Sequence, residues 1–471
     1  MVGIKRLTAT LAMAGCFALL SGKVVTGHVR TGKTPMVDII VTDGLHFTYT
    51  KSDGAYILDA PEDAKFVYLI TPKGYVADYS SGVPQFYQRI VEGRKSHDFE
   101  LYPMKGNSDK TLMIASSDPQ LDTDHDVGRF FNETLTDMQQ VLKDYADRQR
   151  AMFMAGDLTW DVYGKNKAIK QYAQKLGIPL YPVIGNHDYD KYATPCNGAN
   201  YAAPYENDFG PTYYAFQFGD TYYVVLNDIK FEGHKRYTYS IRQGHQMEWL
   251  KTLLNVVFQQ DNNVFIVAHA PICRPGDTEL LIDGAEELKT MLARKPFRAS
   301  FFTGHTHING VTYVGNDIWE YNLGTMCGYW WTSNYSGDGT PNGYKLILAD
   351  GKEWQQVYKS TGWPLEKQFQ IYKPGQIAER PNAVCCKIWN YDSRWQLHWY
   401  EDGKLMGGMN QFYSFAPEYL QFLDGRLATA DYTPIRSNHF FSCKPSNSAR
   451  EIKIEAVDPY GNVYEDSILL K

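Results

Sequence analysis

The sequence has no excess of basic residues, few cysteines and, after its N-terminus, no hydrophobic run long enough to span a membrane. Lys and Arg number 47 against 53 Asp and Glu in 471 residues, a net charge of −6, which argues against a nucleic-acid binder that depends on a basic surface. The seven cysteines include no pair with zinc-knuckle spacing, so a thiolate zinc site is not indicated. Hydrophobic residues make up 44% and aromatic residues 14% of the chain, which excludes disorder and predicts about three folded domains at this length.

The N-terminus has the pattern of an export signal. Lys5 and Arg6 precede an uncharged run of 16 residues from Leu7 to Gly22, shorter than the roughly 20 residues that span a bilayer. We therefore expect residues 1–22 to be a signal peptide and the protein to reach the periplasm or cell surface. Met13-Ala14-Gly15-Cys16 resembles a bacterial lipoprotein box, so Cys16 is either a lipid anchor or a cysteine removed with the signal. Export would permit disulfides among the other cysteines, but their spacing indicates no pairing.

Three segments with different patterns of apolar residues and turns follow one another along the chain. Residues 23–105 alternate short apolar runs with turns such as Asp43-Gly44, which predicts a small β-sandwich. Residues 106–362 alternate β-rich runs with helical periodicity, as in a predicted helix over 132–148, which indicates a layered α/β domain. Residues 363–471 return to strands and turns, which predicts a second β-sandwich.

Five polar clusters follow predicted strands of the middle region. They are Ser117-Asp118-Pro119-Gln120, Gly156-Asp157-Leu158-Thr159, Gly185-Asn186-His187-Asp188, His269-Ala270-Pro271 and Gly304-His305-Thr306-His307. Because a layered α/β domain places ligands outside the carboxyl ends of its strands, we expect these clusters to converge. They offer carboxylate, amide and imidazole groups without thiolate, and their joint occurrence predicts a metal centre.

The order D-x-Q, GD, GNHD, H, GHTH resembles the calcineurin-like metallophosphoesterase family, and the flanking sandwiches resemble the extra domains of a bacterial secreted subgroup. The resemblance implies an α+β fold with a central four-layer α/β/β/α domain and a centre of two divalent ions, Mn, Fe or Zn. It implies that Asp157 bridges both ions. The remaining ligands it implies are Asp118, Gln120 and His307 at the first site and Asn186, His269 and His305 at the second.

The chemistry of two ions agrees with these roles. Cations about 3.5–4 Å apart need a bridging carboxylate to offset their repulsion, and together they lower the pKa of a shared water enough to make hydroxide for in-line attack on phosphorus. His187 is in neither ligand set, so it is free to stabilise the equatorial oxygens or to protonate the leaving alkoxide. The family supports this histidine with an acidic partner, which here is Asp188 or a more distant carboxylate.

Position 120 departs from the resemblance, because the family usually has histidine there. An amide oxygen is a poorer donor than imidazole to Mn, Fe or Zn, so the first site is expected to be weaker or to be completed by water or another side chain. The nearest substitute is His125 in the loop Asp122-Thr123-Asp124-His125-Asp126. The alternative for this segment is a solvated acidic loop.

Two aromatic groups have two interpretations each. Gly328-Tyr329-Trp330-Trp331 is either an apolar wall for the leaving group or core packing against the C-terminal sandwich. The C-terminal aromatics form either a sugar-stacking face or a sandwich core. They are Trp389, Tyr391, Trp395, Trp399 and Tyr400.

The leading functional hypothesis is an exported, metal-dependent hydrolase of phosphate mono- or diesters, acting on a small-molecule, glycan-linked or lipid-linked ester. The alternative is a catalytically silent cell-envelope binding protein on the same fold, with Gln120 marking decay of the site. His187 counts against this alternative, because a structural metal site would not need it. A nuclease is a third class, and the acidic balance counts against it.

Overall fold

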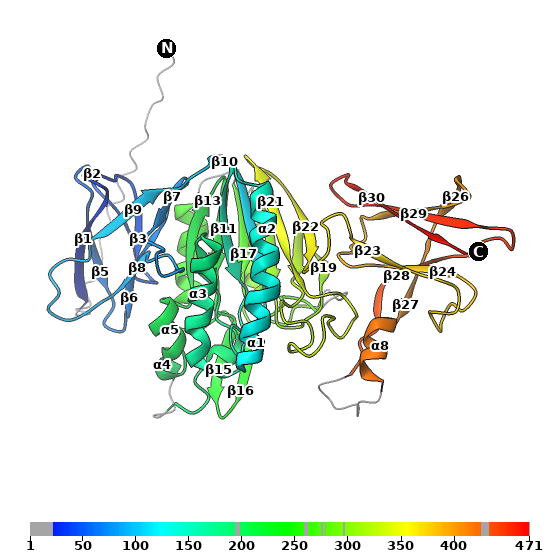
Figure 1. Cartoon of the computed structure of the whole chain (residues 1–471). Helices are drawn as coiled ribbons and strands as arrows, with labels where there is room; N and C mark the ends of the chain where they lie inside the picture. Colours follow the sequence, from blue (N-terminus) through cyan, green and yellow to red (C-terminus); the bar gives the residue numbers. More distant parts are fainter. Residues whose placement is uncertain are drawn as a thin grey trace, which may run out of the picture.

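The computed structural model describes residues 22–193, 198–258, 262–274, 277, 279–294, 297–424 and 433–470. Residues 1–21 of the expected signal peptide, including Cys16, lie outside these described residues, as does Cys196. The other five cysteines are buried. Among the described residues, no helix is long and apolar enough to cross a membrane. Figure 1 shows a central domain with a smaller sheet domain on either side.

The N-terminal domain is a β-sandwich. One sheet has the order β2-β1-β9-β7 with β5 also paired to β1, and the other has the order β4-β3-β6-β8. Alternate residues of β5 are buried, as expected for strands with one face in the core. The strands are β1 (Lys23–Thr31), β2 (Thr34–Pro35), β3 (Ile40–Thr42), β4 (Phe47–Tyr49), β5 (Ala55–Ala60), β6 (Phe66–Ile70), β7 (Tyr75–Ala77), β8 (Tyr87–Arg89) and β9 (Phe99–Pro103).

The central domain contains two mixed sheets. The five-stranded sheet has the order β12-β11-β10-β21-β22, and the six-stranded sheet has the order β13-β14-β17-β18-β20-β19. The first sheet contains β10 (Asn107–Ser116), β11 (Arg148–Met154), β12 (Leu180–Pro182), β21 (Gly343–Asp350) and β22 (Glu353–Ser360). The second contains β13 (Tyr214–Phe218), β14 (Thr221–Val225), β17 (Asn263–Val267), β18 (Arg298–Thr303), β19 (Gly310–Gly315) and β20 (Ile318–Asn322).

Both faces of these sheets are buried. Along β10, Met113 and Ala115 belong to a core shared with Phe265 and Phe302 of the other sheet, whereas Leu112 and Ile114 belong to the core that includes the helices. This period of two explains why the central strands are apolar almost without interruption. The fold is therefore the expected α+β arrangement, with two sheets face to face and helices outside.

Short helices and one hairpin connect the central strands. They are α1 (Asp124–Arg129), η1 (Phe130–Leu135), α2 (Thr136–Asp144), η2 (Tyr163–Lys165), α3 (Asn166–Leu176), η3 (Asn186–Asp188), α4 (Gly198–Tyr201), α5 (Ala203–Phe209), β15 (Ile229–Gly233), β16 (Arg236–Tyr239), α6 (Gln246–Thr252), η4 (Leu253–Val257) and α7 (Ala285–Ala293). The helix predicted over 132–148 begins earlier, because Thr123 and Asp126 form a capping box. It passes through the π-helical turn η1 and ends at Asp144.

The C-terminal domain is also a β-sandwich, with sheets in the orders β23-β24-β28-β27 and β26-β25-β29-β30. Trp389, Trp395 and Trp399 are buried, so these tryptophans are core residues as in the second interpretation. The elements are β23 (Phe369–Tyr372), β24 (Val384–Ile388), β25 (Gln396–Glu401), β26 (Lys404–Gly408), β27 (Asn410–Ser414), α8 (Pro417–Leu423), β28 (Ser437–Cys443), β29 (Glu451–Val457) and β30 (Val463–Leu469). The sheets group residues 23–103, 107–360 and 369–469, while the domain boundaries themselves stay predictions.

Candidate metal centre

The five polar clusters converge at one edge of the two central sheets. They follow the carboxyl ends of β10, β11, β12, β17 and β18. In the first sheet β10, β11 and β12 run parallel to one another, and in the second β17 and β18 do so. A backbone bridge between Leu121 and Thr159 ties the first two clusters together. The convergence expected from the strand-end rule is therefore observed.

One group of side chains gathers around Asp118. His307 Nε2 lies 3.3 Å from Asp118 Oδ1 and 2.9 Å from Gln120 Nε2. Gln120 Nε2 also lies 3.3 Å from Asp157 Oδ2. These are the residues expected at the first site, and the structure brings them together.

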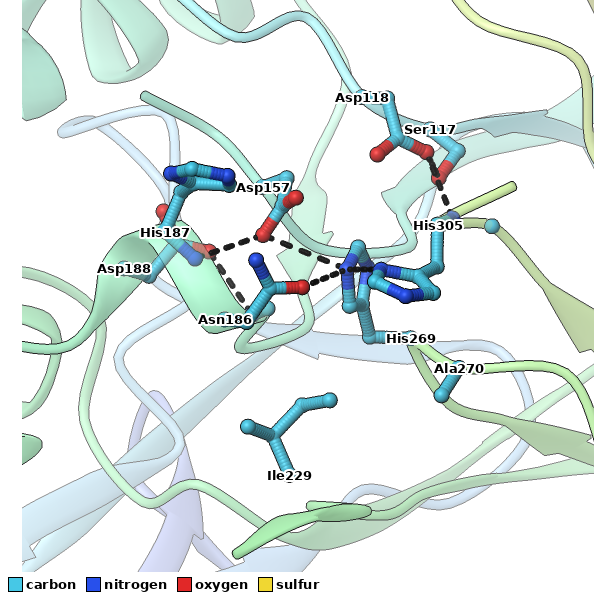
Figure 2. Close-up of polar contacts among 12 residues, drawn as sticks. Ser117, Asp118, Asp157, Asn186, His187, Asp188, Ile229, His269, Ala270 and His305 are labelled. Carbon is cyan, nitrogen blue, oxygen red and sulfur yellow. Dashed lines mark hydrogen bonds and ion pairs between the residues drawn. The ribbon is translucent and has the colours of Figure 1, made fainter. Parts of the chain in front are cut away.

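A second group gathers around His269. Its Nε2 lies 3.3 Å from Asp157 Oδ1, 3.1 Å from Asn186 Oδ1 and 3.1 Å from His305 Nδ1. Figure 2 shows these side chains pointing toward one another. Asp157 thus faces the first group with one carboxylate oxygen and the second group with the other, which is the geometry that a bridging ligand needs.

The turns that carry these residues have an unusual backbone. Five of the residues have positive φ, between 43° and 68°, a region that costs an L-residue roughly 1–2 kcal/mol. They are Asp118, Gln120, Asp157, His305 and His307. The turns also need close contacts, since a Cβ on Gly156 would lie 2.4 Å from His269 Nδ1. Such strain concentrates at functional sites, where it fixes side chains in place.

The donor set fits divalent cations. Asp118 Oδ1 and Gln120 Oε1 are buried, and neither accepts a hydrogen bond from any residue that the structure describes. One ligand atom from each of Asp157, His269 and His305 lies within 4.8 Å of the other two. Buried polar atoms normally have a hydrogen bond, so buried oxygens that lack one, beside converging imidazoles, indicate a place for metal ions.

The electrostatics of the second group also favour positive charge. Burial lowers the pKa of His269, but the carboxylates of Asp157 and Asp118 outweigh it and raise that pKa to about 10. Burial, together with the neighbouring His269, lowers the pKa of His305 to about 4. The pKa values of these two adjacent imidazoles thus shift in opposite directions. The carboxylates stabilise one positive charge at this position, but two imidazolium ions side by side would repel each other.

The second group has supports that the sequence did not indicate. His269 Nδ1 lies 2.8 Å from the carbonyl oxygen of Ala155, which leaves Nε2 facing the centre. The backbone amides of His269 and Ala270 donate to the buried carboxylate of Asp228. Tyr239 of the β15–β16 hairpin places its hydroxyl 2.8 Å from His305 Nε2. Neither Asp228 nor Tyr239 lies in a motif that could have revealed it.

His187 lies beside the second group and has its own partners. Its backbone amide donates to Asp157 Oδ1 at 2.8 Å, and its ring stacks on Trp160 with centroids 3.8 Å apart. The Nδ1 atom lies 2.9 Å from Asp161 Oδ1 and 3.1 Å from Lys191 Nζ. The acidic partner of His187 is therefore Asp161.

Asp188, the other candidate for the acidic partner of His187, bonds to backbone amides instead. Its carboxylate accepts hydrogen bonds from the backbone amides of Gly185, Leu158 and Thr159, at 2.8, 3.0 and 3.3 Å. Burial, together with the nearby Asp157, raises the pKa of Asp188 to about 8. Asp188 thus links its own turn to the turn that follows Asp157 by hydrogen bonds, and it does not contact the His187 ring.

His125 is exposed, and the adjacent Trp330 and Trp331 lie in different environments. The His125 side chain is 70% exposed and lies beside Asp126 at the start of α1, so it does not replace Gln120. Trp331 is buried and donates from Nε1 to the carbonyl oxygen of Pro119 at 2.7 Å. Trp330 instead lies 5.8 Å from the ring of His307 and 5.5 Å from that of Trp160. One tryptophan is core and the other borders the site.

A cavity in the described part of the chain lies away from this site. It has a volume of about 410 Å³ and lies between the N-terminal and central domains, with Asp63, Lys65, Glu206, Tyr213 and His245 in its lining. None of the predicted ligands lines it. The candidate site is therefore identified by the chemistry of converging side chains and not by cavity size.

Comparison with known proteins covers all three domains. Residues 23–104 match the family model "N terminal of Calcineurin-like phosphoesterase", residues 115–309 match "Calcineurin-like phosphoesterase", and residues 320–464 match "C terminal of Calcineurin-like phosphoesterase". The third match begins within β20 and so includes β21 and β22 of the central sheet. No curated protein sequence matches the chain.

The comparison with solved structures gives matches of low sequence identity, among them the following three. A dimetal phosphatase from Danio rerio is 14% identical, covering 53% of this chain and 99% of its own, with a TM-score of 0.35. A purple acid phosphatase from yellow lupin (Lupinus luteus) seeds is 12% identical, covering 69% and 67%, with a TM-score of 0.38. A 5′-nucleotidase from Candida albicans is 14% identical, covering 53% and 52%, with a TM-score of 0.35.

Proposed function

The chain belongs to the calcineurin-like phosphoesterase family and is a phosphoric ester hydrolase, and we propose that it hydrolyses phosphate mono- or diesters with two divalent metal ions. The observation that carries this proposal is the position of Asp157, which presents one oxygen to each of two ligand groups. A single-metal site would not need a carboxylate shared in this way.

The two groups divide the ligands between the ions. Asp118 Oδ1, His307 Nε2 and Gln120, with its amide turned so that Oε1 takes the place of Nε2 beside His307, would hold the first. Asn186 Oδ1, His269 Nε2 and His305 Nδ1 would hold the second, with Asp157 shared. When bound, the ions supply an activated water as nucleophile and offset the charge of the phosphate. The donor types suit Mn, Fe or Zn.

His187 acts on the substrate and not on the metals. With Nδ1 turned toward Asp161 and Lys191, its Nε2 is the atom left to donate a proton to the leaving oxygen or a hydrogen bond to the phosphoryl group. The stack on Trp160 fixes the plane of the ring. This arrangement favours an enzyme over a silent binding protein, because metal binding alone has no use for it.

We further propose that the protein is exported and acts on a small-molecule, glycan-linked or lipid-linked phosphate ester. The proposal of export rests on the pattern of residues 1–22. Cys16 would add a lipid anchor if the lipoprotein box is processed.

The test is a chelation and reloading experiment. Purified protein is stripped with EDTA, reloaded separately with Mn, Fe or Zn, and assayed on a panel of mono- and diesters. We expect hydrolysis to vanish on stripping and to return with at least one metal. Hydrolysis that survives stripping would contradict the metal mechanism, and two bound ions without any hydrolysis would favour the silent binding protein.

Gln120→His is expected to tighten the first metal site about 10-fold, because imidazole is a stronger donor than an amide oxygen. The variant should need less Mn for half-maximal activity. Gln139→His, on the exposed face of α2, is the matched control and should behave like wild type. Unchanged Mn dependence would mean that position 120 is not a ligand, and a fall in maximal rate would mean that the pocket is shaped around the amide.

Asp161→Asn is expected to lower kcat about 10- to 100-fold with both metals retained, since a carboxylate that orients an imidazole contributes part of its acid–base effect. Metal content and kcat are measured on the same preparation. Asp124→Asn is the control, because Asp124 is exposed and pairs with Lys165, away from His187. Wild-type kcat in Asp161→Asn would remove Asp161 from the mechanism.

A further inference from the structure

The loop over residues 323–342, between β20 and β21, lies against the first ligand group. Thr325 Oγ1 donates to the carbonyl oxygen of Asp118 at 2.9 Å, and the Met326 amide donates to that of Ser117 at 3.0 Å. Trp331 holds Pro119 in the same way, and Trp330 lies against His307. The loop therefore braces the strained turn that carries Asp118 and Gln120.

The C-terminal sandwich holds the far side of this loop. Lys387 of β24 points its ammonium group at Asp338, donating to the backbone carbonyl, to Oδ2 at 3.1 Å, and to Thr340 Oγ1 at 3.0 Å. Both charged side chains are 0% exposed. The Ile435 amide donates to the carbonyl oxygen of Gly337 at 2.9 Å. Removing one partner of such a buried ion pair strongly destabilises the structure around it, because the other charge is left buried without compensation.

A second contact reaches the first ligand group independently. Asn309, two residues after His307, is buried and donates from Nδ2 to the carbonyl oxygen of Trp389 at 2.9 Å. Two of the chain segments that supply first-group ligands are thus connected to the C-terminal sandwich, the Asp118–Gln120 turn through the loop and the segment after His307 directly.

The supports of the second ligand group lie in the central domain, among the residues that the structure describes, namely Ala155 and Asp228 for His269 and Tyr239 for His305. His305 shares its turn with His307, and its backbone amide donates to Asp118 Oδ2 at 3.0 Å, so the two groups are linked. The C-terminal sandwich is therefore coupled most directly to the first group.

From this asymmetry we propose that Lys387 and Asp338 are positioning residues through which the C-terminal sandwich sets metal affinity at the first site more strongly than at the second. The inference rests on the proposed ligand sets. It makes the C-terminal domain part of the catalytic unit, since the ligand geometry of one site depends on a contact between domains.

The test is the Mn content of the full-length Lys387→Met variant after dialysis against a low, fixed concentration of free Mn. We expect about two ions per chain in wild type and about one in the variant, with roughly 10-fold more Mn needed for half-maximal activity. Lys359→Met is the matched control, because it breaks another buried pair, Lys359 with Asp137 at 2.6 Å, without touching the loop. It should retain two ions.

A double variant guards against misfolding. Asp338→Asn with Lys387→Met leaves no uncompensated buried charge but still lacks the bonds from Lys387, so it should fold and still lose the first ion. Retention of two ions in the folded double variant, or equal ion loss in Lys359→Met, would overturn the proposal. Wild type that binds two Mn ions without hydrolysing any ester would instead contradict the proposed function, because the Mn count does not depend on turnover.

Discussion

Asp157→Asn is expected to lower kcat/KM by about 10⁴-fold and to empty both metal sites. The two carboxylate oxygens of Asp157 face different ligand groups, at 3.3 Å from Gln120 Nε2 and 3.3 Å from His269 Nε2. An amide of the same size carries no charge and offers only one oxygen, so it cannot offset the repulsion of two ions. Metal analysis and steady-state kinetics on the same preparation provide the measurement.

A neighbouring carboxylate serves as the control for this variant. Asp126→Asn alters an acid in the same domain that caps α1 and lies outside the ligand groups, so it should retain both metals and near-normal kinetics. If Asp157→Asn kept normal metal content and rate, the ligand assignment would be wrong. His269→Ala should also abolish turnover but should empty chiefly the second site, because it removes a buried ligand of the second group.

His187→Ala is expected to lower kcat by about 10²- to 10⁴-fold, the usual contribution of a general acid or base, with both metals retained. The ring contacts Asp161, Lys191 and Trp160, not the ligand groups. Only its backbone amide contacts Asp157, and alanine keeps that amide. The separation of turnover from metal binding is the distinctive result.

A comparison of esters with different leaving groups tests the role of His187 further. If His187 protonates the leaving oxygen, its loss should slow alkyl esters more than p-nitrophenyl esters, because p-nitrophenolate leaves without a proton. His125→Ala, at an exposed position on α1, is the control and should match wild type. Loss of metal from a folded His187→Ala variant would make His187 a ligand and would contradict the role proposed for it.

The strand-end clusters could be predicted because their signal is local. Each cluster follows an apolar run, and parallel strands bring their carboxyl ends to one edge. The convergence of Asp118, Asp157 and His269 therefore follows from alternation and order alone. The two faces of β10 were equally predictable, since a strand buried on both faces is apolar almost throughout.

The partners of these residues could not be predicted, because they depend on the paths of loops. Asp161 reaches His187 only because the turn after Asp157 places it there, and Tyr239 reaches His305 from a hairpin with no motif. Lys387 and Asp338 are 49 positions apart and would normally be assigned to the surface. Their burial is a property of the contact between domains, which periodicity does not describe.

The most direct test of the two-metal centre is anomalous X-ray diffraction from crystals of the Mn-loaded protein. We expect two anomalous peaks about 3.5–4 Å apart, on opposite sides of the Asp157 carboxylate, one beside His307 and the other beside His305. A single peak, or peaks away from Asp157, would contradict the two-metal site on which the proposed function depends.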